Sequence, residues 1–407
     1  MSRLWFAGMG LAGMAALFVA CFTEPPLLQP ESESGEGGAV AEGGASPRPV
    51  CDEDVQDGCV RVVRPHAGET FTCAAIEDGT LRCFGYNDSG QLGDPTLPLS
   101  ASDRGVVANL VVDEATVLAL GHRHGCALSE GTVRCWGRNQ LGQLGTGDDE
   151  FALEPVEVMS DVQVLDAYGD TTCAVRDGAV FCWGRAHDGQ PWTGLDEGTF
   201  DASPTPVPLP FSVSVIALGT LHTCALDTSR SQLWCWGRDM AVGRSDWETN
   251  PAPAQVAPTL RTPVHRLLAA GSSTCVLAGE PATVQCWGFL PDGNAPAFEP
   301  TDLPVPPDGE VVDLVVGWVH ACVLLADGRV QCWGRDRESA LGSPGGATTM
   351  PRTVVGIEDA TALAVGRSQS CAMTTDHAMW CWGANEWGQL GDGTTTGSAV
   401  PVRVRWP

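Results

Sequence analysis

Gly121-His122-Arg123-His124-Gly125-Cys126-Ala127-Leu128, a short turn, and Val133-Arg134-Cys135-Trp136-Gly137 form the clearest copy of a unit that recurs along the chain. The unit ends on Gly142-Gln143-Leu144-Gly145. Its first cysteine recurs every 47–53 residues, giving seven units between about residue 60 and the end, at Cys73, Cys126, Cys173, Cys224, Cys275, Cys322 and Cys371. A period near 50 residues, with short apolar runs between glycines and prolines, indicates a propeller or a solenoid.

Each unit carries the signals of short strands. Val117-Leu118-Ala119-Leu120 and Leu314-Val315-Val316 are apolar runs typical of buried strands. The two cysteine-bearing segments of a unit flank a turn, often Asp-Gly as at Asp78-Gly79, which predicts a β-hairpin. No segment has sustained helical periodicity. The expected fold class is therefore all-β, with antiparallel hairpins repeated in a propeller or a solenoid over residues 51–407, and the family resemblance given below implies a seven-bladed β-propeller of antiparallel blades.

The two ends of the array predict how the ring closes. A Pro-x-x-Val segment precedes the buried strand of later units, as at Pro155–Val158 and Pro351–Val354. The first unit lacks it, and the chain end has a spare copy at residues 400–404. Because an open ring would leave unpaired strand edges, we predict that this C-terminal strand pairs with the first blade. The alternative is that Val60–Val63 fills that edge and the tail hangs free.

The unit resembles the repeat of the regulator of chromosome condensation family, Gly-x-x-His-x-x-Ala-Leu, a turn, Val-x-x-Trp-Gly-x-Asn and Gly-Gln-Leu-Gly. The resemblance covers residues 60–407 and implies a seven-bladed propeller. Phe84-Gly85 replaces Trp-Gly in the first unit, and the other six units have Trp136, Trp183, Trp236, Trp287, Trp333 and Trp382. The histidine is present at His124, His222 and His320. A residue repeated around a ring is expected to be structural, bonding a neighbouring backbone, rather than catalytic.

The cysteines of the units come in pairs 9–11 residues apart: Cys73 with Cys83, Cys126 with Cys135, Cys173 with Cys182, Cys224 with Cys235, Cys275 with Cys286, Cys322 with Cys332, and Cys371 with Cys381. Zinc sites favour cysteines two to four residues apart, and the sequence contains no such pair. Residues flanking a short hairpin turn face each other at a distance that a disulfide tolerates. We therefore predict one disulfide per unit and an oxidising compartment.

Cys51 and Cys59 enclose a short acidic loop, residues 52–58, and are predicted to pair as well. The loop has some likeness to a calcium-binding loop. Its ligand spacing departs by one residue from the EF-hand pattern, and the glutamate at the twelfth position is missing. A solvated, disulfide-closed turn is therefore preferred over a calcium site, and neither a metal nor a cofactor is expected.

Residues 1–20 have the features of a signal peptide, with Arg3 before an apolar run from Leu4 to Ala20. Phe18-Val19-Ala20-Cys21 resembles the lipobox of bacterial lipoproteins, which implies that Cys21 carries lipid. An ordinary cleaved signal peptide or a retained anchor is the alternative. Residues 21–50, rich in Pro, Gly, Ser and Glu, are predicted to be a disordered tether. The expected location is the bacterial cell envelope, at the outer membrane or cell surface, with only the lipid contacting the membrane.

The composition argues against several classes of partner and of catalytic mechanism. The chain has 23 arginines, no lysine and 50 acidic residues, a net charge of −27. This charge argues against nucleic acid and anionic lipid as partners. The absence of lysine excludes Schiff-base and Ser-Lys mechanisms, and the sequence has no Gly-x-Ser-x-Gly elbow and no phosphate loop. A non-catalytic binding or scaffold protein is therefore favoured.

Exposed aromatic residues between the units are the candidate binding surface: Trp192, Phe200, Trp247, Phe298 and Trp387. They could instead fold back as loop packing. The expected partner of this monomeric propeller is a protein or a glycan. One alternative is an enzyme acting on polysaccharide, a glycosidase or lyase with carboxylates from different blades. A remoter alternative, implied by the resemblance alone, is guanine-nucleotide exchange.

Overall fold

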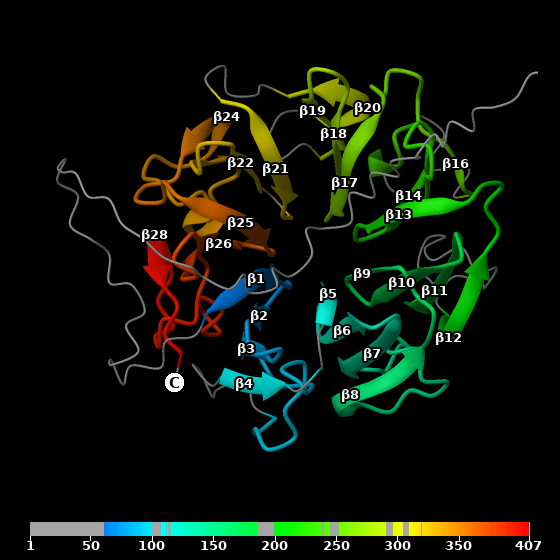
Figure 1. Ribbon diagram of the computed structural model, residues 1–407, viewed down its shortest axis with the longest axis horizontal. Coiled ribbons are helices and arrows are strands. Elements are labelled where there is room, and N and C mark those ends of the chain that lie inside the picture. Colours follow the sequence, from blue (N-terminus) through cyan, green and yellow to red (C-terminus); the bar gives the residue numbers. More distant parts are fainter. Residues whose placement is uncertain are drawn as a thin grey trace, which may run out of the picture. The chain divides into compact units, whose positions relative to one another are not determined.

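The computed structural model describes residues 61–99, 107–110, 112, 115–185, 199–237, 240–244, 252–289, 296–303, 309–318 and 320–406. Within these ranges, seven four-stranded antiparallel sheets stand in chain order around a ring (Figure 1). The first strand of each sheet lies nearest the centre, and the last lies at the outside. The predicted fold class, a seven-bladed β-propeller, is confirmed.

The strands follow the same order in every blade. The first three blades contain β1 (Val62–Ala67), β2 (Phe71–Ile76), β3 (Leu81–Gly85) and β4 (Val107–Leu110); β5 (Ala115–Leu120), β6 (His124–Ser129), β7 (Thr132–Gly137) and β8 (Ala152–Met159); and β9 (Val164–Tyr168), β10 (Thr171–Arg176), β11 (Ala179–Arg185) and β12 (Phe200–Val207). The fourth and fifth contain β13 (Val213–Leu218), β14 (His222–Asp227), β15 (Leu233–Gly237) and β16 (Ala254–Gln255); and β17 (Val264–Ala270), β18 (Ser273–Ala278), β19 (Thr283–Gly288) and β20 (Ala297–Asp302).

The sixth and seventh blades contain β21 (Val311–Val316), β22 (His320–Leu325), β23 (Val330–Gly334) and β24 (Thr348–Thr353); and β25 (Ala360–Val365), β26 (Gln369–Thr374), β27 (Met379–Gly383) and β28 (Ser398–Arg403). The helices in the described residues are two 3₁₀ turns, η1 (Met240–Val242) and η2 (Arg337–Ser339). This matches the lack of helical periodicity in the sequence.

The core is divided into seven apolar wedges, one between each pair of neighbouring blades. The wedge between the second and third blades joins Leu128, Val133 and Met159 to Leu165 and Trp183 of the next blade. The tryptophans of the six Trp-Gly pairs are all buried in such wedges. Each of these rings buries roughly 150–250 Å², so the repeated tryptophan is a principal contact that sets one blade against the next.

Each hairpin between the second and third strands of a blade is closed by a disulfide. The two cysteines lie directly opposite each other in the register of these strands, and their Cα atoms are 4.0–4.1 Å apart. In blade order, the bonds join Cys73 to Cys83, Cys126 to Cys135, Cys173 to Cys182, Cys224 to Cys235, Cys275 to Cys286, Cys322 to Cys332, and Cys371 to Cys381. The seven pairs are those predicted from the spacing. Cys21, Cys51 and Cys59 lie outside the described residues.

The predicted pairing of residues 400–404 with the first blade is wrong. β28 pairs with β27 and is the outer strand of the seventh blade. The error lies in the repeat boundary, because the Pro-x-x-Val segments are not the first strands of their units. Pro155 lies in β8 and Pro351 in β24, which close the preceding blades. The seventh blade therefore needs the last copy for itself, and β1 completes the first blade at the inner edge.

The ring closes by side-chain packing between the seventh and first blades. Val404 and Phe84 lie in one apolar wedge, and the Trp406 ring packs edge-on against Phe84 with 5.8 Å between centroids. Gln369 Nε2 donates to the carbonyl oxygen of Gly68 at 2.8 Å. The alternative prediction, that the C-terminal tail hangs free, is therefore wrong. The C-terminal segment contacts the first blade without joining its sheet.

Candidate functional site at the mouth of the ring

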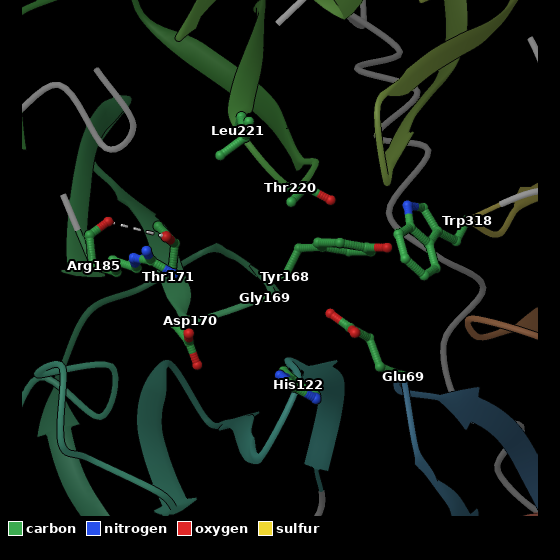
Figure 2. Close-up of a pocket in the computed structure, with 10 residues that line it drawn as sticks. All are labelled: Glu69, His122, Tyr168, Gly169, Asp170, Thr171, Arg185, Thr220, Leu221 and Trp318. Atoms are coloured by element: carbon green, nitrogen blue, oxygen red, sulfur yellow. Dashed lines mark hydrogen bonds between the residues drawn. The ribbon is translucent and has the colours of Figure 1, made fainter. Parts of the chain in front are cut away.

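The loops that join the first and second strands of the blades surround a cavity of about 270 Å³. Figure 2 labels its ten lining residues. Glu69, His122, Gly169, Thr220 and Trp318 come from five different blades. Because side chains from so much of the ring meet there, the cavity lies at the axis of the propeller. We call it the axial mouth.

Part of each loop is fixed by contacts between blades. In the second blade, the His124 ring lies directly on Gly121, where an added Cβ would overlap the ring. His124 Nε2 lies 2.8 Å from Thr172 Oγ1 of the third blade. The same bond joins His222 to Thr274 at 2.8 Å and His320 to Ser370 at 2.7 Å. Glycine at the first position of the repeat therefore makes room for the histidine that bridges to the next blade.

The hydroxyl in this bridge is itself bound to the Gly-Gln-Leu-Gly segment. Thr172 Oγ1 donates to the Gln143 carbonyl at 3.0 Å, and Trp183 Nε1 donates to the same oxygen at 3.0 Å. Because the hydroxyl proton goes to that carbonyl, His124 Nε2 carries the proton of its own bond. The histidines are structural, as predicted, but their partner is a hydroxyl group rather than the backbone.

Burial holds two of these histidines, His124 and His320, neutral. Removal from water lowers the pKa of His124 and of His320 to about 4, because desolvation penalises the imidazolium. The nearby carboxylate of Asp170 opposes this effect at His124 without reversing it. A neutral imidazole that donates one fixed hydrogen bond serves packing, and these groups are not available as acids or bases at neutral pH.

The third and fifth blades depart from this pattern. Where the other blades have glycine followed three residues later by a large side chain, the third has Tyr168 and Thr171, and the fifth has Ala270 and Ser273. A small side chain at the second position leaves space at the first. The third blade uses that space to place a tyrosine at the axial mouth.

The residue four before the first cysteine of each unit lies in these loops and is different in almost every blade. The seven are Glu69, His122, Gly169, Thr220, Gly271, Trp318 and Arg367. The positions one before and two after it, Gly121 and His124 in the second blade, recur in several blades because the histidine packs on the glycine and bonds to the next blade, whereas the position directly after it varies as well. The backbone at this position also bonds between blades, His122 N–H to the Gly169 carbonyl at 2.8 Å and Thr220 N–H to the Gly271 carbonyl at 2.7 Å. Its side chain is not part of the glycine–histidine contact, so the variety of that side chain gives the ring a chemistry that differs from blade to blade.

The charged and aromatic groups of the axial mouth influence one another. Burial raises the pKa of Glu69, and His122 and Arg367 partly offset the rise. Burial and the nearby Glu69 raise the pKa of Tyr168. The Arg367 guanidinium lies 4.0 Å from the centre of the Trp318 ring, a cation–π contact. Figure 2 shows the Tyr168 hydroxyl directed toward Trp318 and the Glu69 carboxylate directed into the cavity, below the Tyr168 ring.

The predicted aromatic surface is not one patch. Phe200 and Phe298 are exposed on the outer strands of the third and fifth blades. Trp387 belongs to the seventh blade and is half-buried, with its ring 4.4 Å from that of Tyr86. For Trp387 the alternative, loop packing, describes the observed contact. Trp192 and Trp247 lie outside the described residues.

The sequence reasoning missed Glu69, Tyr168 and Trp318. A signal for Glu69 and Trp318 was present, because aligning the seven units on their cysteines isolates two adjacent variable positions after the glycine of the repeat. Tyr168 stands at the glycine position itself, where the third unit departs from the repeat. Among the described residues, no group of three or more His, Cys, Asp or Glu side chains could hold a metal ion. No helix in the same ranges is long and apolar enough to cross a membrane.

Comparison with models of protein families gives matches to one family of repeats. Two models described as the regulator of chromosome condensation (RCC1) repeat match residues 311–339, and residues 130–173 and 376–407. The ultraviolet-B receptor UVR8 of Arabidopsis thaliana is 25% identical over 335 residues, covering 76% of this chain and 73% of the receptor. A protein RCC2 homolog of Danio rerio is 38% identical over 105 residues, covering 25% of this chain and 20% of that protein.

Solved structures agree on the architecture. Human WBSCR16 superposes with a TM-score of 0.71 at 20% identity, covering 81% of this chain and 94% of that one. Prp20p of Saccharomyces cerevisiae superposes with a TM-score of 0.67 at 19% identity, covering 85% of this chain and 88% of that one. At these identities the likeness concerns the fold alone.

Proposed function

Because this chain is a propeller built from regulator of chromosome condensation repeats, we propose that it is a non-catalytic scaffold that binds a protein partner at the axial mouth. The observation that carries the proposal is the variable position of the inner loops. The glycine and histidine positions near it serve the packing of the blades, whereas Glu69, His122 and Trp318 gather around one cavity. Rigid repeats that present variable loops are typical binding surfaces.

The related propellers supply a precedent for protein binding. The yeast structure of Prp20p was described together with its binding to Gsp1p and histones, and a second yeast structure has Kap60 bound to RCC1 (Prp20). These partners are not assigned to this chain. The shared use of the fold as a protein-binding platform is what supports the proposal.

The test is capture of partners by the full chain, purified from a host that oxidises its cysteines. Trp318→Ala should remove captured partners, and their cross-links to the wild type should fall on the inner loops. Met350→Ala is the matched control, because this exposed side chain lies on the outer strand of the same blade. Equal capture by wild type and Trp318→Ala would contradict binding at the mouth.

An enzyme acting on polysaccharide is the second candidate, because two carboxylates, Glu69 and Asp170, line the same cavity and glycoside hydrolysis needs such a pair. Asp170 is bound by other groups of the chain: Gln143 Nε2 donates to it at 3.2 Å, and Arg138 lies 3.9 Å away. Polysaccharide cleavage that Glu69→Gln abolishes would establish the enzyme and overturn the scaffold.

The seven disulfides indicate an oxidising, extracellular type of environment. We propose further that a lipid on Cys21 holds the propeller at a bacterial cell envelope, with residues 21–50 as the tether. Labelling with a palmitate analogue should mark the wild-type chain and not Cys21→Ser. Equal labelling of both would exclude the anchor.

A further inference from the structure

The axial mouth contains one carboxylate that its surroundings leave unpaired. Glu69 is half-buried, and its carboxylate has no hydrogen bond or ion pair within the described part of the chain. Desolvation raises its pKa, which means that the site disfavours the charged form. A partly desolvated charge without a partner gains most from a ligand of opposite charge.

The walls beside Glu69 are aromatic. Trp318 and Tyr168 both line the cavity. The face of an aromatic ring attracts cations, and Trp318 already holds the Arg367 guanidinium at 4.0 Å from its centre. Arg367 itself is not among the residues that line the cavity. A carboxylate beside two aromatic rings is the chemistry that recognises an ammonium or a guanidinium group.

Two positive groups, His122 and Arg367, act on Glu69 electrostatically, but neither forms a hydrogen bond or ion pair with it in the described part of the chain. Asp170 has Arg138 and Gln143 as partners. Arg185 is exposed, so water screens its charge. The half-buried charge without a partner in the cavity is therefore negative, and a cation fits better than an anion.

Size and net charge limit what the cation can belong to. The cavity of about 270 Å³ is below the roughly 300–1,000 Å³ typical of pockets for whole small molecules. It suits one long side chain. The net charge of −27 would also draw a basic surface toward this chain.

We propose that the axial mouth binds a single cationic side chain, lysine or arginine, presented by the partner protein, with Glu69 as its counter-ion and Trp318 and Tyr168 as its walls. The inference rests on the proposed function, because it names the chemistry by which the scaffold would recognise its partner.

The experiment measures binding of four capped amino acids to the full chain by saturation-transfer NMR. The N-acetyl amides of lysine and arginine should bind saturably, whereas those of glutamine and glutamate should not. Glu69→Gln should weaken cation binding by about tenfold or more. Glu77→Gln is the matched control, because this exposed glutamate lies at the opposite end of β2 in the same blade and should leave binding unchanged.

A second variant should change cation binding in the opposite direction. Arg367→Gln removes a positive charge that acts on Glu69, so it should tighten cation binding. An anion site would behave in reverse, with N-acetylglutamate amide bound and Arg367→Gln weakening it. That result, or equal binding of the neutral glutamine compound, would overturn the proposal.

The outcomes separate this inference from the proposed function. Cation binding that depends on Glu69, with partner capture unaffected by Trp318→Ala, would retain the cation site and reject the mouth as the scaffold's binding surface. Partner capture that depends on Trp318, with no binding of either cationic amide, would retain the scaffold and reject the cation site.

Discussion

His122 lies in the loop before β6 and His124 is the first residue of that strand, and the two histidines belong to different parts of the molecule. His124 is buried between blades, bonded to Thr172, and has counterparts in His222 and His320. His122 lines the axial mouth, and the other six blades have a different residue at its position. The loop with the start of β6 thus has one part held by its neighbours and one part free to vary. The first should govern stability and the second binding, and four predictions test this division.

The largest effect is expected where the hairpin beside this loop loses its disulfide. In the chain-entropy model, closing a loop of about ten residues contributes about 2.7 kcal/mol. Cys126→Ala with Cys135→Ala should therefore lower the free energy of unfolding by about that amount, measured by urea denaturation. Unchanged stability would mean that the disulfide between Cys126 and Cys135 does not constrain the unfolded chain.

The next prediction compares the apolar wedge between the seventh and first blades with the wedge between the sixth and seventh blades. Val404 and Val354 are both buried in wedges, and their N–H groups donate to the third strands of the seventh and sixth blades, at Met379 and Val330. Each valine-to-alanine change should cost about 2 kcal/mol in urea denaturation, because apolar contact between blades is lost. If Val404→Ala left the free energy of unfolding unchanged while Val354→Ala lowered it, the ring would not be held closed by its C-terminal segment.

From the sequence we predicted the features that recur in every blade and missed the residues that differ from blade to blade. The periodic cysteines, the Trp-Gly pairs and the Asp-Gly turns are local signals, and they identified the blades and the disulfides. The closure was predicted wrongly because a Pro-x-x-Val segment is compatible with the outer strand of one blade and the first strand of the next. Glu69 and Trp318 were missed because a mouth is made by loops about 50 residues apart in sequence, whose meeting depends on the ring.

A smaller effect should appear with acid. The pKa of His124 is about 4 in the fold against about 6.5 in an unfolded chain. Between these values the unfolded state binds more protons, so stability falls as the pH is lowered, by about 1.4 kcal/mol per pH unit for each such histidine. His124→Gln, which adopts the residue of the seventh blade, should make the dependence shallower by about that slope.

The reciprocal change serves as the control for the acid effect. Gln369→His places an imidazole beside the first blade, where the buried Thr72 hydroxyl takes the place that Thr172 has in the third. The pH dependence of thermal melting should therefore steepen. Identical pH profiles for wild type and both variants would show that these buried positions do not titrate with folding.

The smallest effect on stability is expected at the mouth. Glu69 has no bonding partner in the described part of the chain, and its raised pKa means that the charged form weakens the fold at pH 7. Glu69→Gln removes that charge while keeping the shape of the side chain. The free energy of unfolding should stay within about 0.5 kcal/mol of wild type, or rise, while cation binding weakens by about tenfold or more. A loss as large as that of Val404→Ala would place Glu69 among the residues that hold the blades together. A stable variant with weakened cation binding would instead separate the two parts of the loop, because one residue would then serve the ligand at no cost to the ring.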